Sequence, residues 1–116
     1  MNQRVYELLK QTAKSNNIIF YSELNKICEL GLDFNRNKDR KRLGQILGEI
    51  SRYEHSRQHP LLSVVAVYMG EQIPADSFFN LAQELGVMNA DESNLEFFSR
   101  HLTETLEYWR RNPDSA

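Results

Sequence analysis

The spacing of apolar residues in the first third of the chain predicts two helices joined by an extended segment. Residues 3–14 are expected to form an amphipathic helix, because apolar side chains recur at the helical positions Val5, Leu8, Leu9 and Ala13. The β-branched and aromatic run 18–21 predicts an extended piece. Ser22 is a good N-cap for a short second helix, which Gly31 ends as the C′ residue.

The middle of the chain predicts one long helix followed by a buried strand. The helix begins near Asp39 and runs to about His55, and its buried stripe consists of Leu43, Ile46, Leu47 and Ile50. Pro60 sets a boundary after this helix. The segment 61–69 is rich in β-branched residues and carries no charge, which is typical of a central strand covered on both faces.

Two further helices are predicted in the last third of the chain. Asp76 caps a fourth helix that ends at Gly86, and Asp91 starts a fifth. The inward stripe of the fifth helix consists of Leu95, Phe98, Leu102, Leu106 and Trp109. Within the pairs Phe78-Phe79 and Phe97-Phe98 the two rings cannot both follow one stripe, so we expect one member of each pair on the surface. A homodimer through the C-terminal helices would cover that surface.

Length and composition indicate one domain. The chain has 116 residues, of which 41% are apolar, and it contains no repeat or low-complexity linker. We expect the domain to span residues 1–112 and residues 113–116 to form a frayed tail. Cys28 is the only cysteine and the first residues lack the apolar run of a signal peptide, so a cytoplasmic location is expected. No stretch is apolar over the roughly 20 residues that a membrane-spanning helix needs.

Charge is distributed unevenly along the chain. The whole chain carries a formal net charge of −2, whereas the segment 36–57 holds seven cationic and three anionic side chains. On a helical wheel, the face opposite the aliphatic stripe carries Lys38, Lys41, Gln45, Arg52 and Ser56. This face either is simply solvated or meets an anionic partner, because Lys and Arg contacts to phosphates supply most of the sequence-independent affinity for nucleic acid.

Gly44 and Gly48 lie four residues apart on one flank of the same helix. Glycine costs roughly 1 kcal/mol of helix stability relative to alanine at each position. We therefore expect something to approach this flank closely, either another helix, a strand or a phosphate backbone.

Several short motifs follow one another in an order that is similar to a known family. They are Tyr21-Ser22-Glu23-Leu24 after the first helix, Lys41-Arg42-Leu43-Gly44 in the long helix, and Pro60-Leu61 ahead of Val64-Val65. In this order they resemble the winged-helix domain of alkylguanine-DNA alkyltransferases and alkyltransferase-like proteins. The resemblance covers about the first two-thirds of the chain and implies a winged-helix-like core with a short sheet over residues 3–72. The two additional helices predicted over residues 74–112 have no counterpart in the family, and for the whole chain we expect an α+β, mainly helical fold.

The resemblance also implies roles for single residues. Tyr21 matches the family's tyrosine, Lys41 falls where its DNA-intercalating arginine lies, and Leu43-Gly44 match its Val-Gly. The family's reactive Pro-Cys-His-Arg-Val segment has no counterpart, because residues 62–66 contain neither a thiol nor a histidine. Alkyl transfer needs an activated thiolate, so this activity is not implied. The helix 43–55 also resembles helices of bacterial proteins, and that likeness implies no activity.

Other candidate chemistry is sparse. Cys28 falls on the apolar side of the second helix, where a small buried hydrophobe is the ordinary interpretation. His55 and His59 have a spacing that suits a metal, but Pro60 ends the helix, and a cation near a helix C-terminus is the simpler role. His101 has no evident partner and is expected to be exposed or half-buried. No motif predicts a catalytic residue, a metal site or a cofactor, so we do not expect an enzyme.

The sequence therefore predicts a non-enzymatic binding module for DNA or RNA. Lys38, Lys41, Gln45 and Arg52 are the expected contacts, and Tyr21 and Arg42 flank them. The alternative is a protein interaction or adaptor domain, or a homodimer, whose partner meets the basic face or the aromatic pairs. These two hypotheses differ in how strongly salt weakens binding.

Overall fold

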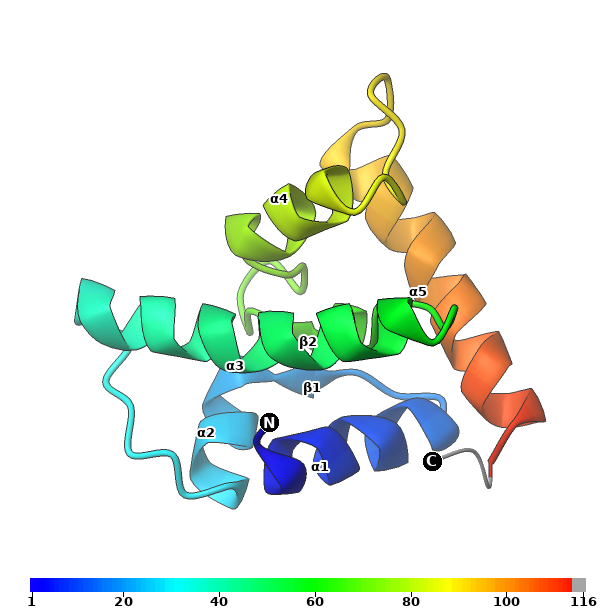
Figure 1. Cartoon of the computed structure of the whole chain (residues 1–116). Helices are drawn as coiled ribbons and strands as arrows, with labels where there is room; N and C mark the ends of the chain where they lie inside the picture. The colour runs from blue at the N-terminus through cyan, green and yellow to red at the C-terminus, as the bar shows by residue number, and fades with distance from the viewer. Residues whose placement is uncertain (114–116) are drawn as a thin grey trace.

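A computed structural model of the chain describes residues 1–113 and shows a mainly helical α+β fold (Figure 1). Residues 114–116 of the predicted tail lie outside the described part. In chain order the elements are α1 (Gln3–Lys14), β1 (Ile19–Phe20), α2 (Tyr21–Ile27), α3 (Asn37–Ser56), the 3-10 helix η1 (Leu62–Val65), β2 (Ala66–Val67), α4 (Asp76–Glu84) and α5 (Asn94–Arg111).

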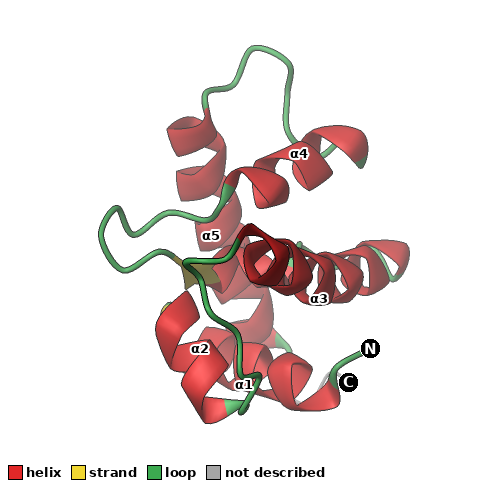
Figure 2. Cartoon of the chain, turned by 90° about the vertical axis from the view of Figure 1, so that its left-hand side faces the viewer, coloured by secondary structure: helices red, strands yellow, loops and turns green. Residues whose placement is uncertain are grey.

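The centre of the molecule is the segment 61–67, in which no residue is more than 3% exposed. α1, α3 and α5 all pack against η1 within it. α3 crosses the molecule with α1 and α2 on one side of it and α4 on the other, as two perpendicular views show (Figures 1 and 2). The predicted burial is thus confirmed for residues 61–67, whereas Tyr68 and Met69, the last two residues of the predicted run, are 41% and 59% exposed.

The predicted strand over residues 61–69 is wrong in its conformation. Residues 62–65 form a 3-10 turn, and only Ala66 and Val67 pair, in parallel, with Ile19 and Phe20. Side chains take the place of ladder partners for the remaining backbone: the N–H of Ser63 donates to Ser51 Oγ and that of Leu61 to His101 Nε2. A run that is buried on all sides has no periodicity that separates a turn from a strand.

Helix α1 has the predicted bounds, whereas the other helices start at different residues than expected. α2 begins at Tyr21, one residue before the expected cap Ser22, and the Glu23 carboxylate accepts the N–H of Phe20. α3 begins two residues before Asp39. α4 includes Asp76 as its first residue, and α5 starts after a capping box between Ser93 and Glu96 rather than at Asp91.

The buried face of α5 is broader than predicted and is rotated about the helix axis. It carries Phe97, Phe98, His101, Thr105 and Trp109, whereas Leu95 is 64% exposed. The expectation that one ring of each phenylalanine pair is exposed is wrong, since Phe78 and Phe79 are buried as well. The rings of Phe78 and Phe79 lie 5.9 and 6.4 Å from that of Phe97, so α4 and α5 cover each other's rings. The surface on which the homodimer hypothesis rested is therefore absent from these four residues.

Candidate functional site

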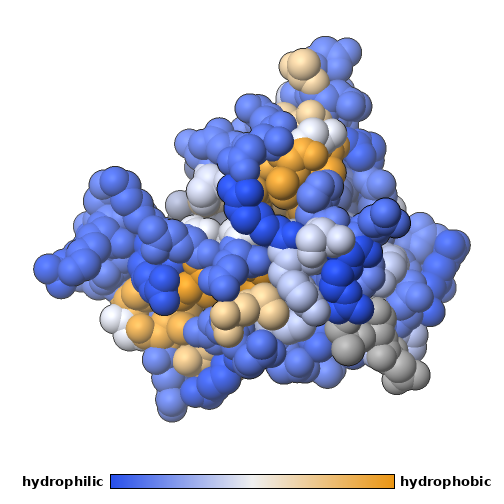
Figure 3. Space-filling model, in the orientation of Figure 1, coloured by the Kyte–Doolittle hydropathy of each residue, from blue (hydrophilic) through white to orange (hydrophobic). Residues whose placement is uncertain are grey.

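The aliphatic stripe of α3 points into the molecule as predicted. Leu43, Ile46, Leu47 and Ile50 are all buried, with exposed fractions of 6% or less. Burying this stripe against the centre turns the opposite face of α3 outward. The amino-terminal end of α3 projects from the body, and its visible surface is hydrophilic throughout (Figure 3).

Five cations stand at this projecting end, which we call the cationic end of α3: Arg36, Lys38, Arg40, Lys41 and Arg42. All five are exposed. Arg40 donates to two neutral acceptors, the Phe34 carbonyl and Asn37 Oδ1. Within residues 1–113 the side chains of the other four have no hydrogen bond or ion pair. Cations near a helix amino terminus oppose the helix dipole, so this end is electrostatically suited to an anion.

Four of the six predicted contacts lie together on one face of α3. Lys38, Lys41, Arg42 and Gln45 line a shallow hollow of about 510 Å³, together with Asn37 and Asp39. The Asp39 carboxylate accepts the backbone N–H of Asp33 at 2.8 Å, and it is the single anion within residues 36–42. The structure therefore brings these four contacts together as the sequence predicts.

Arg52 lies farther along the same face but is paired. Its guanidinium is 2.6 Å from the Glu84 carboxylate of α4, and this hydrogen bond raises the pKa of Arg52 and lowers that of Glu84. Between Gln45 and Arg52, the Glu49 carboxylate lies 3.0 Å from the amino group of Met1. The basic face is thus open only in its amino-terminal half.

Tyr21 does not belong to the open face, which corrects the prediction of a flanking contact. It is 5% exposed, and its hydroxyl accepts the N–H of Ala75 at 2.9 Å. Burial raises the pKa of its phenol above the ordinary value. Its ring meets that of Tyr68 at 4.9 Å in a perpendicular arrangement. Tyr21 therefore holds the segment that leads into α4.

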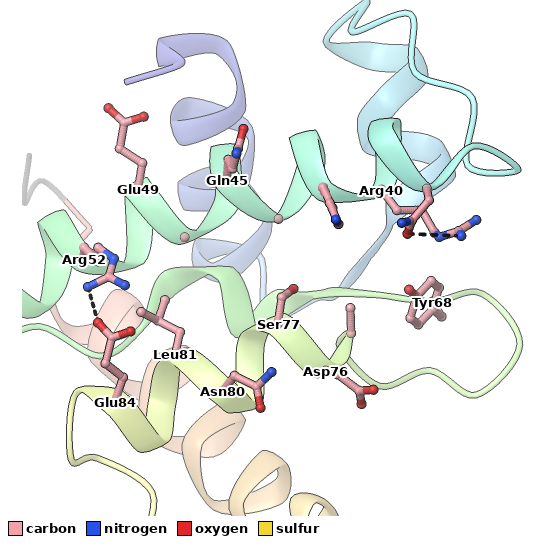
Figure 4. Close-up of a pocket in the computed structure, with 15 residues that line it drawn as sticks. Arg40, Gln45, Glu49, Arg52, Tyr68, Asp76, Ser77, Asn80, Leu81 and Glu84 are labelled. Carbon is pink, nitrogen blue, oxygen red and sulfur yellow. Dashed lines mark hydrogen bonds and ion pairs between the residues drawn. The ribbon is translucent and has the colours of Figure 1, made fainter.

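A groove of about 840 Å³ separates α3 from α4 (Figure 4). Its walls carry residues of α3 and of the segment 68–84, and Gly44 and Gly48 lie along it. A Cβ atom on Gly44 would lie 3.3 Å from Ser77 Oγ, whereas one on Gly48 would lie 3.9 Å from Leu81 Cδ2. The close approach predicted from the two glycines is therefore made by helix α4. We call this feature the α3–α4 groove.

An apolar recess of about 30 Å³ adjoins the α3–α4 groove. Its lining includes Tyr21, Phe34, Leu43 and Leu47, and it shares Arg40, Gly44, Tyr68, Ala75 and Ser77 with the groove. Of these shared residues, Arg40, Tyr68 and Ser77 were not among the contacts predicted from the sequence. Tyr68 lies within the segment 61–69, which was predicted as a buried strand, and a tyrosine in such a strand is expected to be a core residue.

A second polar cluster lies at the other end of α3 and is closed to solvent. Glu54 is fully buried, and its carboxylate accepts the Tyr6 hydroxyl at 2.9 Å and lies 2.7 Å from His59 Nδ1. The burial of Tyr6 and this hydrogen bond raise the pKa of its phenol. His59 thus pairs with a carboxylate rather than with His55. Within residues 1–113 no three His, Cys, Asp or Glu side chains gather as metal ligands.

Two further titratable groups are buried. His101 is 5% exposed, contrary to the expectation, and its Nε2 accepts the N–H of Leu61. Burial, followed by the charge of Arg100, lowers its pKa to about 4, so the ring is neutral near pH 7. Cys28 is buried as predicted, and burial raises the pKa of its thiol. A raised pKa disfavours the nucleophilic thiolate.

Comparison with protein-family models, with curated proteins and with solved structures finds no match for this chain. The resemblance to alkyltransferase winged-helix domains therefore stays a prediction. In this chain the short sheet is a parallel pair of two-residue strands, and no β-hairpin occurs within residues 1–113. None of the described helices is both long and apolar enough to cross a bilayer.

Proposed function

We propose that this protein is a non-enzymatic nucleic-acid-binding module that acts through the amino-terminal half of α3. Lys38, Lys41 and Arg42 contact phosphates, and Gln45 lies beside them on the same face. The observation that carries the proposal is the lack of any carboxylate partner for these three cations within residues 1–113, whereas Arg52 on the same helix has one. A nucleic-acid role accords with the cytoplasmic location expected from the single cysteine.

Local charge, rather than the charge of the whole chain, drives this binding. The net charge of −2 repels a polyanion at long range, so the attraction acts only near the cationic end. Three phosphate contacts correspond to a slope of log K against log salt of about −3 on duplex DNA and about −2 on single strands. Arg52 is left out of this set because its charge is matched by that of Glu84.

The test is the salt dependence of binding to labelled random-sequence duplex DNA, single-stranded DNA and RNA, measured by fluorescence anisotropy. The wild type is expected to bind at least one of them with a slope of about −2 to −3. The variant Lys38→Glu/Lys41→Glu/Arg42→Glu is expected to lose this binding. The charge-matched control Lys26→Glu/Arg110→Glu/Arg111→Glu changes the net charge equally at exposed sites on α2 and α5, where it breaks the surface ion pairs of Arg110 and Arg111 with Glu107. This control is expected to keep nucleic-acid binding.

Two results would overturn the proposal. One is the absence of salt-sensitive association between the wild type and any of the three nucleic acids. The other is an equal loss of binding in both triple variants, which would show a response to net charge alone. Either result would favour the alternative of a protein interaction domain, and capture of a partner that depends on Lys41 would then identify its surface.

A further inference from the structure

Half of the charged side chains that line the α3–α4 groove are paired. Arg52 and Glu84 form an ion pair across the groove, and the carboxylate of Glu49 lies beside the amino group of Met1. In the close-up, Glu49 points away from α4 and Asp76 points away from α3 (Figure 4). Arg40, Lys41 and the outward-pointing Asp76 remain, and neither of the two cations has a carboxylate partner within residues 1–113. The groove therefore presents uncompensated positive charge at one end only.

An aromatic ring lies at that same end. Tyr68 is 41% exposed, and it lines the groove with Arg40 on the opposite wall (Figure 4). The perpendicular contact with Tyr21 and a turn closed by the N–H of Tyr68 donating to the Ile73 carbonyl hold it in place. A fixed ring loses little conformational freedom when a flat group stacks on it.

The wall formed by α4 offers neutral polar groups. Ser77 Oγ is directed toward α3, and the Asn80 amide lies one turn farther along (Figure 4). Both residues are exposed, and their side chains make no hydrogen bond within residues 1–113. Amides and hydroxyls of this kind bond to the edges of unpaired bases.

A stacking ring, neutral hydrogen-bonding groups and uncompensated cations together are what single-stranded nucleic acid requires. A duplex does not use this combination, because its bases are stacked on one another and cannot place a face against a ring in a groove wall. The Arg52–Glu84 pair bridges the two walls at the far end, so the site is short.

We infer that the α3–α4 groove binds a short single-stranded segment, with one base stacked on Tyr68 and its phosphate held by Arg40 and Lys41. Asn80 and Ser77 contact the edge of that base. The inference rests on the proposed function and specifies which form of nucleic acid the protein prefers.

The first test replaces Tyr68. Binding of labelled oligothymidine and of a duplex of equal length is measured for Tyr68→Ala, for Tyr68→Phe and for Met69→Ala, an exposed neighbour outside the groove. Tyr68→Ala is expected to weaken oligothymidine binding about fivefold to a hundredfold, the range measured for loss of one stacked base. Tyr68→Phe and Met69→Ala are expected to stay within about twofold of the wild type, since both keep the Tyr68 ring system.

A second pair of variants tests the groove without touching the ring. Asn80→Glu adds a carboxylate inside the groove, and Gln83→Glu adds one at an exposed position of α4 outside it. Only Asn80→Glu is expected to weaken oligothymidine binding. Because both residues are on the surface, this comparison stays valid even where Tyr68→Ala lowers the melting temperature.

The outcomes separate the inference from the proposed function. Preference for duplex, or oligothymidine binding that neither Tyr68→Ala nor Asn80→Glu weakens, overturns the inference and leaves the proposed function standing. Failure to bind any nucleic acid overturns both. Binding of polyglutamate that depends on Tyr68 overturns the inference in favour of an acidic peptide.

Discussion

The amino-terminal and carboxyl-terminal halves of α3 differ in their charged side chains and in the surroundings of those side chains. In the first half Lys38, Lys41 and Arg42 are exposed and lack polar partners within residues 1–113. In the second half most polar side chains have partners: Ser51 pairs with Ser63, Arg52 with Glu84, and Glu54 with Tyr6 and His59. Arg57, which caps the helix, pairs with Tyr53. The two halves therefore differ both in cationic content, with four Lys or Arg side chains in the first half and Arg52 alone in the second, and in pairing.

The difference has a geometric cause. The second half of α3 lies against the centre of the molecule, where α3 packs on η1 and Glu54 accepts the hydroxyl of Tyr6 from α1, while the first half projects from the body (Figure 1). A buried polar group must be paired because leaving it unpaired costs free energy, whereas an exposed one is satisfied by water. Open charges on this helix therefore mark the surface that is free to bind a partner.

The largest effect on stability is expected from breaking the buried pair of Glu54 and His59 at the carboxyl-terminal end of α3. His59→Ala leaves the carboxylate of Glu54 buried with only the Tyr6 hydroxyl, and it is expected to lower the free energy of unfolding by about 3–5 kcal/mol. Adding Glu54→Gln to this variant removes the unpaired charge, so the double variant loses less than the two single losses together. Urea unfolding followed by circular dichroism measures all three. Additive losses would show that Glu54 and His59 do not act as a pair.

The next largest effect is expected from acid, which should weaken the buried contact between α5 and the central segment. The folded-state pKa of His101 is lowered from 6.5 to about 4, so the unfolded chain takes up the proton first as the pH falls. The stabilisation is complete above about pH 6.5 and is lost progressively down to about pH 4, by about 3 kcal/mol. Glutamine does not titrate in this range. As the pH falls from about 6.5 to about 4, the free energy of unfolding of His101→Gln should therefore rise relative to that of the wild type by about 3 kcal/mol. A constant difference between the two proteins would contradict this assignment.

Replacing Gly44 or Gly48 by alanine is expected to change the stability of the fold by up to about 1 kcal/mol. Gly48→Ala places its Cβ at an ordinary contact distance from Leu81 and gains helix propensity, so it should stabilise the fold by up to about 1 kcal/mol. Gly44→Ala brings its Cβ to 3.3 Å from Ser77 Oγ and should gain less. Combining Gly44→Ala with Ser77→Ala should recover the difference in thermal unfolding. Equal gains at both glycines would show that α4 does not press on Gly44.

The smallest effect on stability is expected at the open half. Lys38→Glu/Lys41→Glu/Arg42→Glu breaks no observed contact and should move the melting temperature by less than about 3 °C. Its direction should be upward, because carboxylates near a helix amino terminus agree with the dipole. Arg52→Glu, which sets two carboxylates against each other across the groove, should lower the melting temperature instead. A marked loss of stability in the triple variant would mean that these cations have structural partners.

Part of the candidate site could be predicted from the sequence. The stripe Leu43, Ile46, Leu47 and Ile50 shows which side of α3 is buried, and the wheel then places Lys38, Lys41 and Gln45 on the opposite side. The glycine pair predicted a close neighbour on one flank, although not which one. Tyr68 gave no signal, because an aromatic residue at the end of an apolar run looks like core until the turn that carries it is known.

What the sequence by itself determined is the property that repeats locally: helices with one apolar face, and a central run without charge. Only the tertiary structure decided that residues 62–65 form a 3-10 helix rather than a strand, that Arg52 pairs with Glu84, and that Tyr21 is buried. Periodicity depends on neighbours within a few positions, so it can be read along the chain. The partner of a side chain, such as Glu54 for Tyr6, is supplied by a segment dozens of residues away, and its position depends on how the whole core packs.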